Sequence, residues 1–277
     1  MSTKKDKFSK KDKKYMSLAL TLASSRHGLT GENPSVGCVI VKNDEIISIG
    51  QTGFNGRPHA EHNAIKNSNE ILKDSTMYVT LEPCNHYGKT PPCTKEIIKN
   101  KISKIIYSVE DIDKKVKGKS KKILESKNII VKKGLLQKKI IDFYKPYFFN
   151  RKNKTPYVTG KIAVSRNNLI YSRDTKRITD FYSDKVTHFL RYKNDSLMIS
   201  YKTLNKDNPK LDCRLEGLNK FSPKRIILDN KLEMDTNSYI FRTANKHNTV
   251  VFYKNPIKKN ISLFKKKGIH LIKSNLL

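Results

Sequence analysis

Two short segments of the sequence hold residues that together could bind a metal ion. The first, PHAEHNAI (residues 58–65), contains His59, and the second, PCNHYGKTPPC (residues 83–93), contains Cys84 and Cys93. Imidazole nitrogen and thiolate sulfur are ligands that zinc prefers in proteins. A proline precedes each of the three residues, and proline is tolerated in the first turn of a helix, where its missing N–H has no partner to lose. The pattern predicts a zinc site in which His59 and Cys93 start two helices.

Three protein ligands leave one position of a tetrahedral zinc ion open, which is typical of a catalytic site. That position can hold water, whose pKa zinc lowers to about 7. Glu61, two residues after His59, is the candidate acid and base that moves the proton, provided that His59 lies at the edge of its helix. Two alternatives stay open: the cysteines could be core residues, or a fourth ligand, His62 or His86, could make the zinc purely structural.

The segments around these residues alternate between helical and strand patterns. Apolar residues at i, i+3, i+4, i+7 and i+8 from Tyr15 predict a helix, and short apolar runs bounded by turn residues predict strands. The expected order continues with a hairpin (36–41 and 46–50), a helix from about His59, a strand (76–81), a helix from Cys93, a strand (104–109), a helix (118–126), a strand at Ile129 and a helix (135–149). This alternation implies an α/β domain, which we place at residues 13–150, after a disordered basic lead-in at residues 1–12.

The pattern HAE…PCNHYGKTPPC, with NPSVGCVIV and TMYVTLEPC upstream of the cysteine loop, resembles the deaminase domain of the bifunctional RibD family of riboflavin biosynthesis. Zinc deaminases in general carry H-x-E followed by P-C-x-x-C, whereas this chain has eight residues between its cysteines. The resemblance implies a cytidine-deaminase-like three-layer α/β/α domain that binds one Zn²⁺ and deaminates a phosphorylated diaminopyrimidinone. It further implies that Glu61 is catalytic, that His59, Cys84 and Cys93 bind the metal, and that Asn33, His86, Lys89 and Asp111 contact the substrate, although the residues after Asp111 depart from the family pattern.

A second α/β unit is expected at residues 156–277, after the polar connection NRKNKTP (150–156). Apolar runs at 157–164, 195–200, 224–229 and 248–253 predict its strands. The segments TPYVTGKIAVS and TLNKDNPKLDCR resemble the reductase domain that follows the deaminase in the RibD family. This resemblance implies a partial dihydrofolate-reductase-like α/β fold, NADPH as the cofactor of that half, and the site residues Lys161, Ser165, Thr203, Asp207 and Arg214.

The match to the reductase pattern is incomplete. SRNN (165–168) stands where the family has Ser-Leu-Asp-Gly, Ser200 stands where a glycine usually lies, and no Glu-Gly-Gly segment precedes Leu277. Glycine at such positions lets the backbone approach a cofactor phosphate closely. Three interpretations stay open: an inactive remnant that stabilises the deaminase, a reductase of reduced size, or a truncated product.

The chain carries a net charge of +32, with 57 Lys and Arg residues against 25 Asp and Glu residues. Such a charge can serve nucleic-acid binding, but the lysines are spread from Lys4 to Lys273 and Trp is absent, a pattern typical of an AT-rich genome. We therefore expect no specific nucleic-acid partner. A tRNA adenosine deaminase and an RNA-binding protein that uses zinc only for folding remain the alternatives.

The apolar stretches, the N-terminus and the cysteines indicate where in the cell the protein is expected. No stretch approaches the ~20 apolar residues that cross a bilayer, and the N-terminus lacks the apolar region of a secretory signal. Four cysteines at irregular spacing fit a reducing compartment better than a disulfide framework. We expect a cytoplasmic enzyme with a small-molecule substrate, which could form a homo-oligomer.

Overall fold

The computed structural model describes residues 8–88, 90–113, 116–170, 178–244 and 248–275. Contacts divide the chain into two units, residues 1–160 and 161–277. Each unit has its own sheet and its own hydrophobic core. Among the described residues, no helix combines the length and the apolar character needed to cross a membrane.

The first unit is built on a five-stranded mixed sheet in the order β2-β1-β3-β4-β5. Strands β1 (Gly37–Lys42) and β2 (Glu45–Gln51) form the expected hairpin, and β1 also pairs antiparallel with β3 (Thr76–Leu81). Strands β4 (Lys104–Val109) and β5 (Ile130–Lys133) continue the sheet in parallel with β3. The parallel strands β3 and β4 therefore end at the same edge, which is where the cysteine loop begins.

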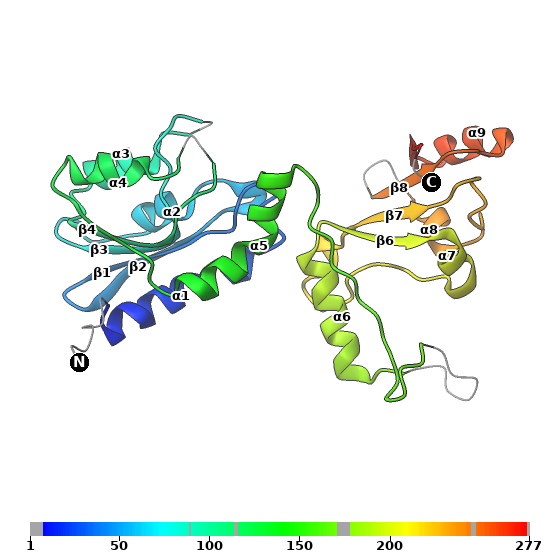
Figure 1. Ribbon diagram of the computed structural model, residues 1–277, viewed down its shortest axis with the longest axis horizontal. Coiled ribbons are helices and arrows are strands. Elements are labelled where there is room, and N and C mark those ends of the chain that lie inside the picture. The colour runs from blue at the N-terminus through cyan, green and yellow to red at the C-terminus, as the bar shows by residue number, and fades with distance from the viewer. Residues whose placement is uncertain (1–7, 89, 114–115, 171–177, 245–247, 276–277) are drawn as a thin grey trace. The chain divides into compact units, whose positions relative to one another are not determined.

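Helices cover both faces of this sheet, as Figure 1 shows. Helices α1 (Lys10–Arg26) and α5 (Gln137–Asn153) lie on one face. Helices α2 (Ala60–Lys66), α3 (Cys93–Lys99) and α4 (Lys119–Glu125) lie on the other, and the short 3₁₀ helix η1 (Phe54–Gly56) leads into α2. The expected three-layer α/β/α architecture is confirmed.

The first helix begins earlier than the sequence pattern predicts. Residues 10–12, expected in a disordered lead-in, form the first turn of α1. Ser9 caps this turn: its hydroxyl accepts from the Asp12 N–H, and the Asp12 carboxylate accepts from the Ser9 N–H at 2.8 Å. This reciprocal capping box satisfies two backbone donors that would otherwise have no partner at the helix start, so the basic residues after Ser9 are held in the helix.

The second unit contains a four-stranded parallel sheet in the order β6-β7-β8-β9. Its strands are β6 (Ser196–Ser200), β7 (Lys224–Leu228), β8 (Thr249–Tyr253) and β9 (His270–Lys273). The accompanying helices are α6 (Phe181–Lys193), α7 (Tyr201–Asp207), η2 (Asn219–Phe221), α8 (Tyr239–Arg242) and α9 (Lys258–Lys266). Three of the four strands expected here, at 195–200, 224–229 and 248–253, are confirmed.

The strand expected at residues 157–164 is wrong, and β9 was not expected. Residues 157–164 have no ladder partner among the described residues, and the side chains of Val158 and Ile162 are 81% and 70% exposed. A strand needs a neighbour for its backbone hydrogen bonds, and apolar alternation alone does not supply one. Strand β9 forms because β8 offers a parallel edge to residues 270–273, beside the buried Ile269.

Gly50 on β2 lies under α2, the helix that follows His59. A Cβ atom at Gly50 would lie 2.2 Å from the Ala60 carbonyl oxygen and 2.4 Å from the Ala64 nitrogen. We predict that Gly50→Ala lowers the free energy of unfolding by about 1–3 kcal/mol, the usual cost of overpacking. Urea denaturation followed by circular dichroism measures this change.

Gly160→Ala is the matched control, because a Cβ atom at Gly160 would meet nothing within 4 Å. Its free energy of unfolding should stay within about 0.5 kcal/mol of the wild type. Equal stability of Gly50→Ala and the wild type would contradict the close packing of α2 on β2.

Candidate metal centre and active site

The three predicted ligands come from two helix starts and one strand end. His59 is the N-cap of α2, with extended backbone angles (φ −69°, ψ 157°), and Cys93 is the first residue of α3. Cys84 follows the end of β3 by three residues. Because His59 lies before the first helical turn, its side chain and that of Glu61 are not held on opposite faces of α2. The expected edge position of His59 is therefore present.

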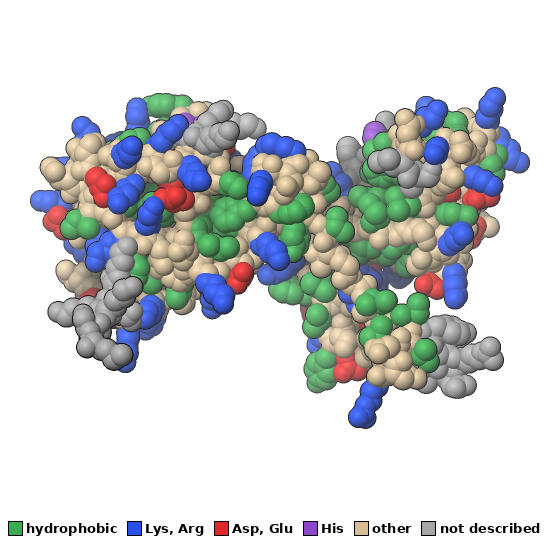
Figure 2. Space-filling model, in the orientation of Figure 1, with side chains coloured by type: hydrophobic (Ala, Val, Ile, Leu, Met, Phe, Trp, Pro, Cys, Tyr) green, Lys and Arg blue, Asp and Glu red, His purple; other side chains and the backbone are tan. Residues whose placement is uncertain are grey.

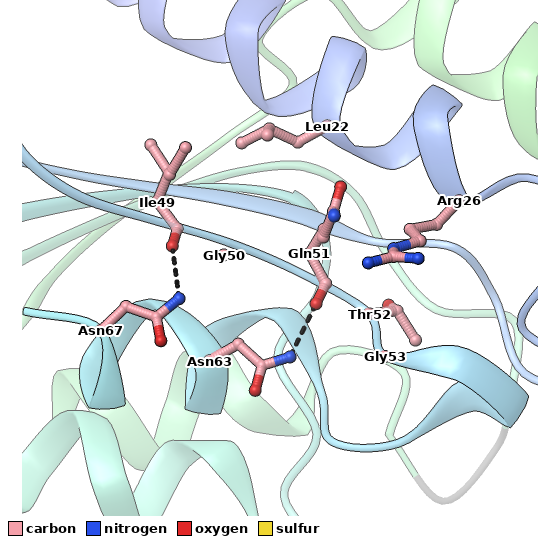
Figure 3. A pocket seen from close by; sticks show the side chains of 9 residues that line it. All are labelled: Leu22, Arg26, Ile49, Gly50, Gln51, Thr52, Gly53, Asn63 and Asn67. Carbon is pink, nitrogen blue, oxygen red and sulfur yellow. Dashed lines mark hydrogen bonds between the residues drawn. The ribbon is translucent and has the colours of Figure 1, made fainter. Parts of the chain in front are cut away.

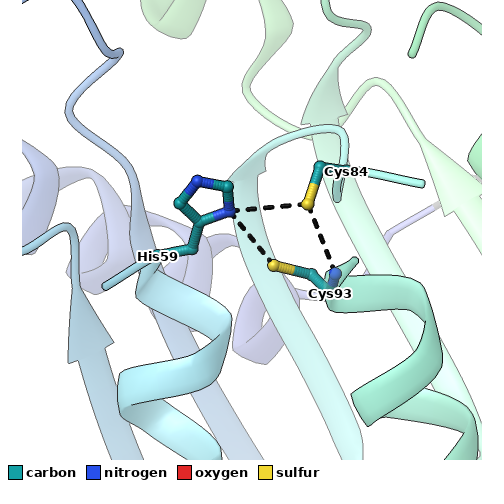
Figure 4. Close-up of side chains that lie close together, drawn as sticks. All are labelled: His59, Cys84 and Cys93. Carbon is teal, nitrogen blue, oxygen red and sulfur yellow. Dashed lines mark hydrogen bonds between the residues drawn. The ribbon is translucent and has the colours of Figure 1, made fainter. Parts of the chain in front are cut away.

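The side chains of these residues meet at one point, as Figure 4 shows. Nδ1 of His59 lies 3.3 Å from Sγ of Cys93 and 3.5 Å from Sγ of Cys84, and all three ligand atoms lie within 4.8 Å of one another. A tetrahedral zinc ion with bonds of roughly 2.1–2.3 Å would separate its ligand atoms by roughly 3.4–3.8 Å. The donor set and its spacing therefore fit zinc with three protein ligands.

Hydrogen bonds already favour a charged sulfur at this point. Hydrogen bonding from the Cys93 thiol lowers the pKa of Cys84 to about 4, and the same interaction raises the pKa of Cys93. The backbone N–H of Cys93 also donates to Sγ of Cys84 at 3.3 Å, and hydrogen bonding to Cys84 raises the pKa of His59. Thiolate is the form that binds metal. The lowered pKa of Cys84 therefore favours the metal-binding form of this side chain.

Glu61 is buried beside the ligands, with 4% of its surface exposed. Burial raises the pKa of its carboxyl group to about 7, while the neighbouring His59 opposes this shift. The carboxyl group also lies within hydrogen-bonding reach of the Cys93 thiol. A carboxyl group that titrates near neutral pH can both accept and return a proton.

The two histidines proposed as a fourth ligand lie elsewhere. Nδ1 of His62 lies 2.9 Å from the Glu96 carboxylate, an interaction that joins α2 to α3. His86 lies on the exposed part of the cysteine loop. Within the described part of the chain, neither histidine belongs to the group of ligand atoms. The geometry therefore favours an open fourth position over a purely structural site.

Of the residues expected to contact substrate, Asn33 is packed near the ligands, His86 is exposed, and Lys89 is not described. Asn33 packs against Gly56, three residues before His59, and a Cβ atom at Gly56 would lie 2.2 Å from the Asn33 amide nitrogen. His86 is exposed in the loop between the cysteines. Lys89 lies outside the described residues.

Asp111 is buried, and its hydrogen bonds are internal. Its carboxylate accepts from the Asp113 N–H at 3.0 Å and from the Tyr147 hydroxyl at 3.2 Å. Burial raises the pKa of Asp111, and these hydrogen bonds oppose that shift. The carboxylate thus fixes the turn after β4 against α5.

Glu82, two residues before Cys84, is a site residue that the sequence reasoning missed. Its buried carboxylate accepts backbone N–H groups from Asp111, Gly118 and Ser120 at 3.4, 3.0 and 3.2 Å. Glu82 therefore ties the strand end that carries Cys84 to the turn after β4. The available signal was a glutamate directly before the Pro-Cys pair at the end of a buried strand.

Arg57 is a second residue near the ligands that the sequence analysis did not predict. Its guanidinium donates from Nη1 to the Thr90 hydroxyl at 2.7 Å, across the gap between the two ligand segments. The signal was an arginine two residues before the histidine ligand, in a sequence where lysine is far commoner.

A hollow of about 260 Å³ between α1, β2 and α2 lies apart from the ligands. Figure 3 shows that Asn63 of α2 and Asn67, the C-cap of α2, line it and donate to carbonyl oxygens of β2, at Gln51 (2.8 Å) and Ile49 (3.4 Å). None of the three ligands lines this hollow. The two amides instead anchor α2 to the sheet, and so help to fix His59.

The residues expected at a reductase site fall into two groups. Thr203 and Asp207 lie one turn apart on α7, and Arg214 pairs with Asp212 at 2.6 Å. Lys161 is exposed, and Ser165 closes a turn by accepting from the Leu169 N–H at 3.0 Å. This last pair belongs to the segment that forms no strand with the second sheet.

On the face drawn in Figure 2, the basic residues that the structure describes do not gather into one stripe. Figure 2 shows Lys and Arg side chains scattered over both units on the face drawn, with hydrophobic and acidic side chains between them. A nucleic-acid groove would need them aligned along a path.

Comparison with known proteins identifies both halves of the chain. The family model described as the cytidine and deoxycytidylate deaminase zinc-binding region matches residues 9–109, and the model of the RibD C-terminal domain matches residues 156–273. The first match includes all three candidate ligands and Glu61.

Relatives match over most of the chain. The riboflavin biosynthesis protein RibD of Aquifex aeolicus is 35% identical over 263 residues, which cover 94% of this chain and 73% of that protein. A diaminohydroxyphosphoribosylamino-pyrimidine deaminase of Buchnera aphidicola subsp. Schizaphis graminum is 43% identical over 146 residues, or 53% of this chain and 99% of that protein.

A solved structure repeats the architecture. The crystal structure of a diaminohydroxyphosphoribosylaminopyrimidine deaminase/5-amino-6-(5-phosphoribosylamino)uracil reductase from Thermotoga maritima matches with a TM-score of 0.80 at 28% identity, covering 95% of this chain and 81% of that one. The resemblance seen in the HAE…PCNHYGKTPPC pattern is thereby confirmed. The chain belongs to the RibD family of riboflavin biosynthesis proteins.

Proposed function

We propose that this chain catalyses the hydrolytic deamination of 2,5-diamino-6-(5-phosphoribosylamino)pyrimidin-4(3H)-one in riboflavin biosynthesis. The observation that carries the proposal is the meeting of His59, Cys84 and Cys93 at one point, with the carboxyl group of Glu61 buried beside them. The name of the Thermotoga maritima protein, which is similar over 95% of this chain, supplies the substrate class. The four free thiols of the chain support a reducing, cytoplasmic location.

The reaction replaces a ring amine by oxygen and releases ammonia. A zinc ion held by His59, Cys84 and Cys93 would lower the pKa of a water molecule to about 7 and so would supply hydroxide at neutral pH. Glu61 takes a proton from the attacking water and delivers it to the departing nitrogen, so that ammonia leaves as the bond from carbon to nitrogen breaks and the new bond from carbon to oxygen is retained. The raised pKa of Glu61, about 7, suits both halves of this transfer.

Other side chains bind and orient the substrate. We assign the amide of Asn33 to the pyrimidine ring, because Asn33 packs beside the segment that leads into His59. His86 is exposed on the cysteine loop and, with Lys89 of the same loop, is assigned to the region of the ribose and its phosphate, without a contact to a particular atom. Asp111 is assigned to substrate contact as well, from the turn after β4 that its bonds to Asp113 and Tyr147 hold in place.

Replacing Glu61 separates metal binding from proton transfer. We predict that Glu61→Gln keeps one zinc ion per chain but lowers the rate of ammonia release by about 10²–10⁴-fold, the usual contribution of a positioned acid or base. Zinc content by mass spectrometry and ammonia by a coupled assay measure the two quantities. Glu45→Gln, at an exposed position of β2, is the control, and wild-type turnover by Glu61→Gln would contradict the mechanism.

Removal of a ligand should abolish zinc binding and activity together. We predict that Cys84→Ser binds less than a tenth of the zinc of the wild type at equal free metal, because the hydroxyl of serine is a far poorer zinc ligand than thiolate. Cys213→Ser, at a buried thiol of the second unit, should keep one zinc ion. Full zinc content in Cys84→Ser would show that the metal lies elsewhere.

A second candidate activity is the NADPH-dependent reduction of the ribosyl chain, which the match of residues 156–273 to the RibD C-terminal domain favours. The segment that carries Lys161 and Ser165 is largely exposed and lies outside the second sheet. We propose that this half supports the deaminase and does not itself turn over NADPH in the purified chain.

The two activities can be followed in one cuvette. We predict that the purified protein releases ammonia from the diaminopyrimidinone without a fall in NADPH absorbance. We also predict that added NADPH does not change the midpoint temperature of thermal unfolding of the protein. NADPH oxidation that follows ammonia release would contradict this proposal and would restore the complete two-step enzyme.

A further inference from the structure

Arg57 joins the two segments that carry the candidate zinc ligands. It lies two residues before His59, and its Nη1 donates to the Thr90 hydroxyl, three residues before Cys93, at 2.7 Å. Its Nη2 would lie 3.4 Å from a Cβ atom at Gly88. The guanidinium therefore spans the space between the approach to α2 and the cysteine loop.

The described residues give the positive charge of Arg57 no acidic partner. Within the described part of the chain, the ion pairs do not include Arg57, and its one side-chain hydrogen bond is to the neutral hydroxyl of Thr90. A guanidinium has five N–H donors, so donors remain for a ligand.

A half-buried guanidinium with a neutral partner is suited to an anion. Arg57 is partly buried, where electrostatic attraction is stronger than in water, and its bond to Thr90 holds the planar group in one orientation before a ligand binds. Such a group can bind phosphate through two parallel hydrogen bonds. The phosphate is the anionic group of the substrate class proposed above.

We infer that Arg57 binds the 5′-phosphate of the pyrimidine substrate and makes the deaminase site selective for the phosphorylated compound. The inference rests on the proposed deaminase function. Arg57 is a specificity-determining residue in this account, and Glu61 and the ligands do the chemistry whether the phosphate is present or not.

The test compares two substrates, the ribosylaminopyrimidine with and without its 5′-phosphate, in the zinc-loaded full chain. For Arg57→Gln we expect KM for the phosphorylated compound to rise about tenfold to a hundredfold, the range of a charge-assisted hydrogen-bonded pair. The kinetic constants for the unphosphorylated compound should change less than threefold. Arg57→Lys keeps the charge without the planar fork, and its KM should lie between those of the wild type and Arg57→Gln.

Lys95→Gln is the matched control. Nζ of Lys95 donates to the Tyr87 hydroxyl at 2.6 Å, so this variant also loses one positive charge and one tether of the cysteine loop. It should keep the preference of the wild type for the phosphorylated compound. An equal loss on both compounds in Arg57→Gln would mean that Arg57 only positions the loop, and an unchanged preference would mean that it does not contact the phosphate; either result overturns the inference.

Failure of the proposed function is distinguishable from failure of this inference. If the wild type released no ammonia from either compound, the deaminase proposal would fall. The affinities of the wild type and of Arg57→Gln for the phosphorylated compound, measured by calorimetry, would then test the role of Arg57 independently of turnover. Equal affinities would refute its role, and an affinity at least tenfold lower in the variant would support it.

Discussion

One imidazole and two thiols must be held within 4.8 Å of one another, and the first unit is arranged around this requirement. Each donor comes from a different kind of position: a helix N-cap, a helix first residue and a strand-end loop. A shift of one of these elements by an ångström would open the triangle. The packing of α2 against Gly50, its amide anchors on β2 and the His62 interaction with Glu96 all fix elements that carry ligands.

The same geometry sets the electrostatics of the catalytic carboxyl group. Glu61 lies in the first turn of α2, and because α2 packs on the sheet, this carboxyl group is buried rather than solvated. Burial alone would make its proton hard to lose, and the positive character of His59 moderates that effect. Glu82 is stabilised differently, because its buried carboxylate accepts hydrogen bonds from three backbone N–H groups. It can therefore fix the strand end before Cys84 without an ion pair.

The strands of the first unit and the three candidate ligands could be predicted from the sequence, because the local patterns and the HAE…PCNHYGKTPPC motif both indicate the same α/β domain. Strands β3 and β4 occupy the predicted ranges 76–81 and 104–109, since each is a short apolar run closed by polar residues. The roles of Glu82 and Arg57 could not be predicted, because each depends on residues distant in sequence, such as Ser120 and Thr90. The predicted strand at 157–164 failed for the related reason that pairing requires a partner, which alternation does not reveal.

We propose that this chain deaminates the phosphoribosyl diaminopyrimidinone with the help of a zinc ion held by His59, Cys84 and Cys93. The most direct measurement is ammonia release by the purified protein, before chelation, after chelation and after zinc is restored. We expect one ammonia per substrate consumed, loss of turnover on chelation and recovery with zinc. Turnover that persists in the fully zinc-free protein, or no ammonia from the zinc-loaded protein, would contradict this proposal.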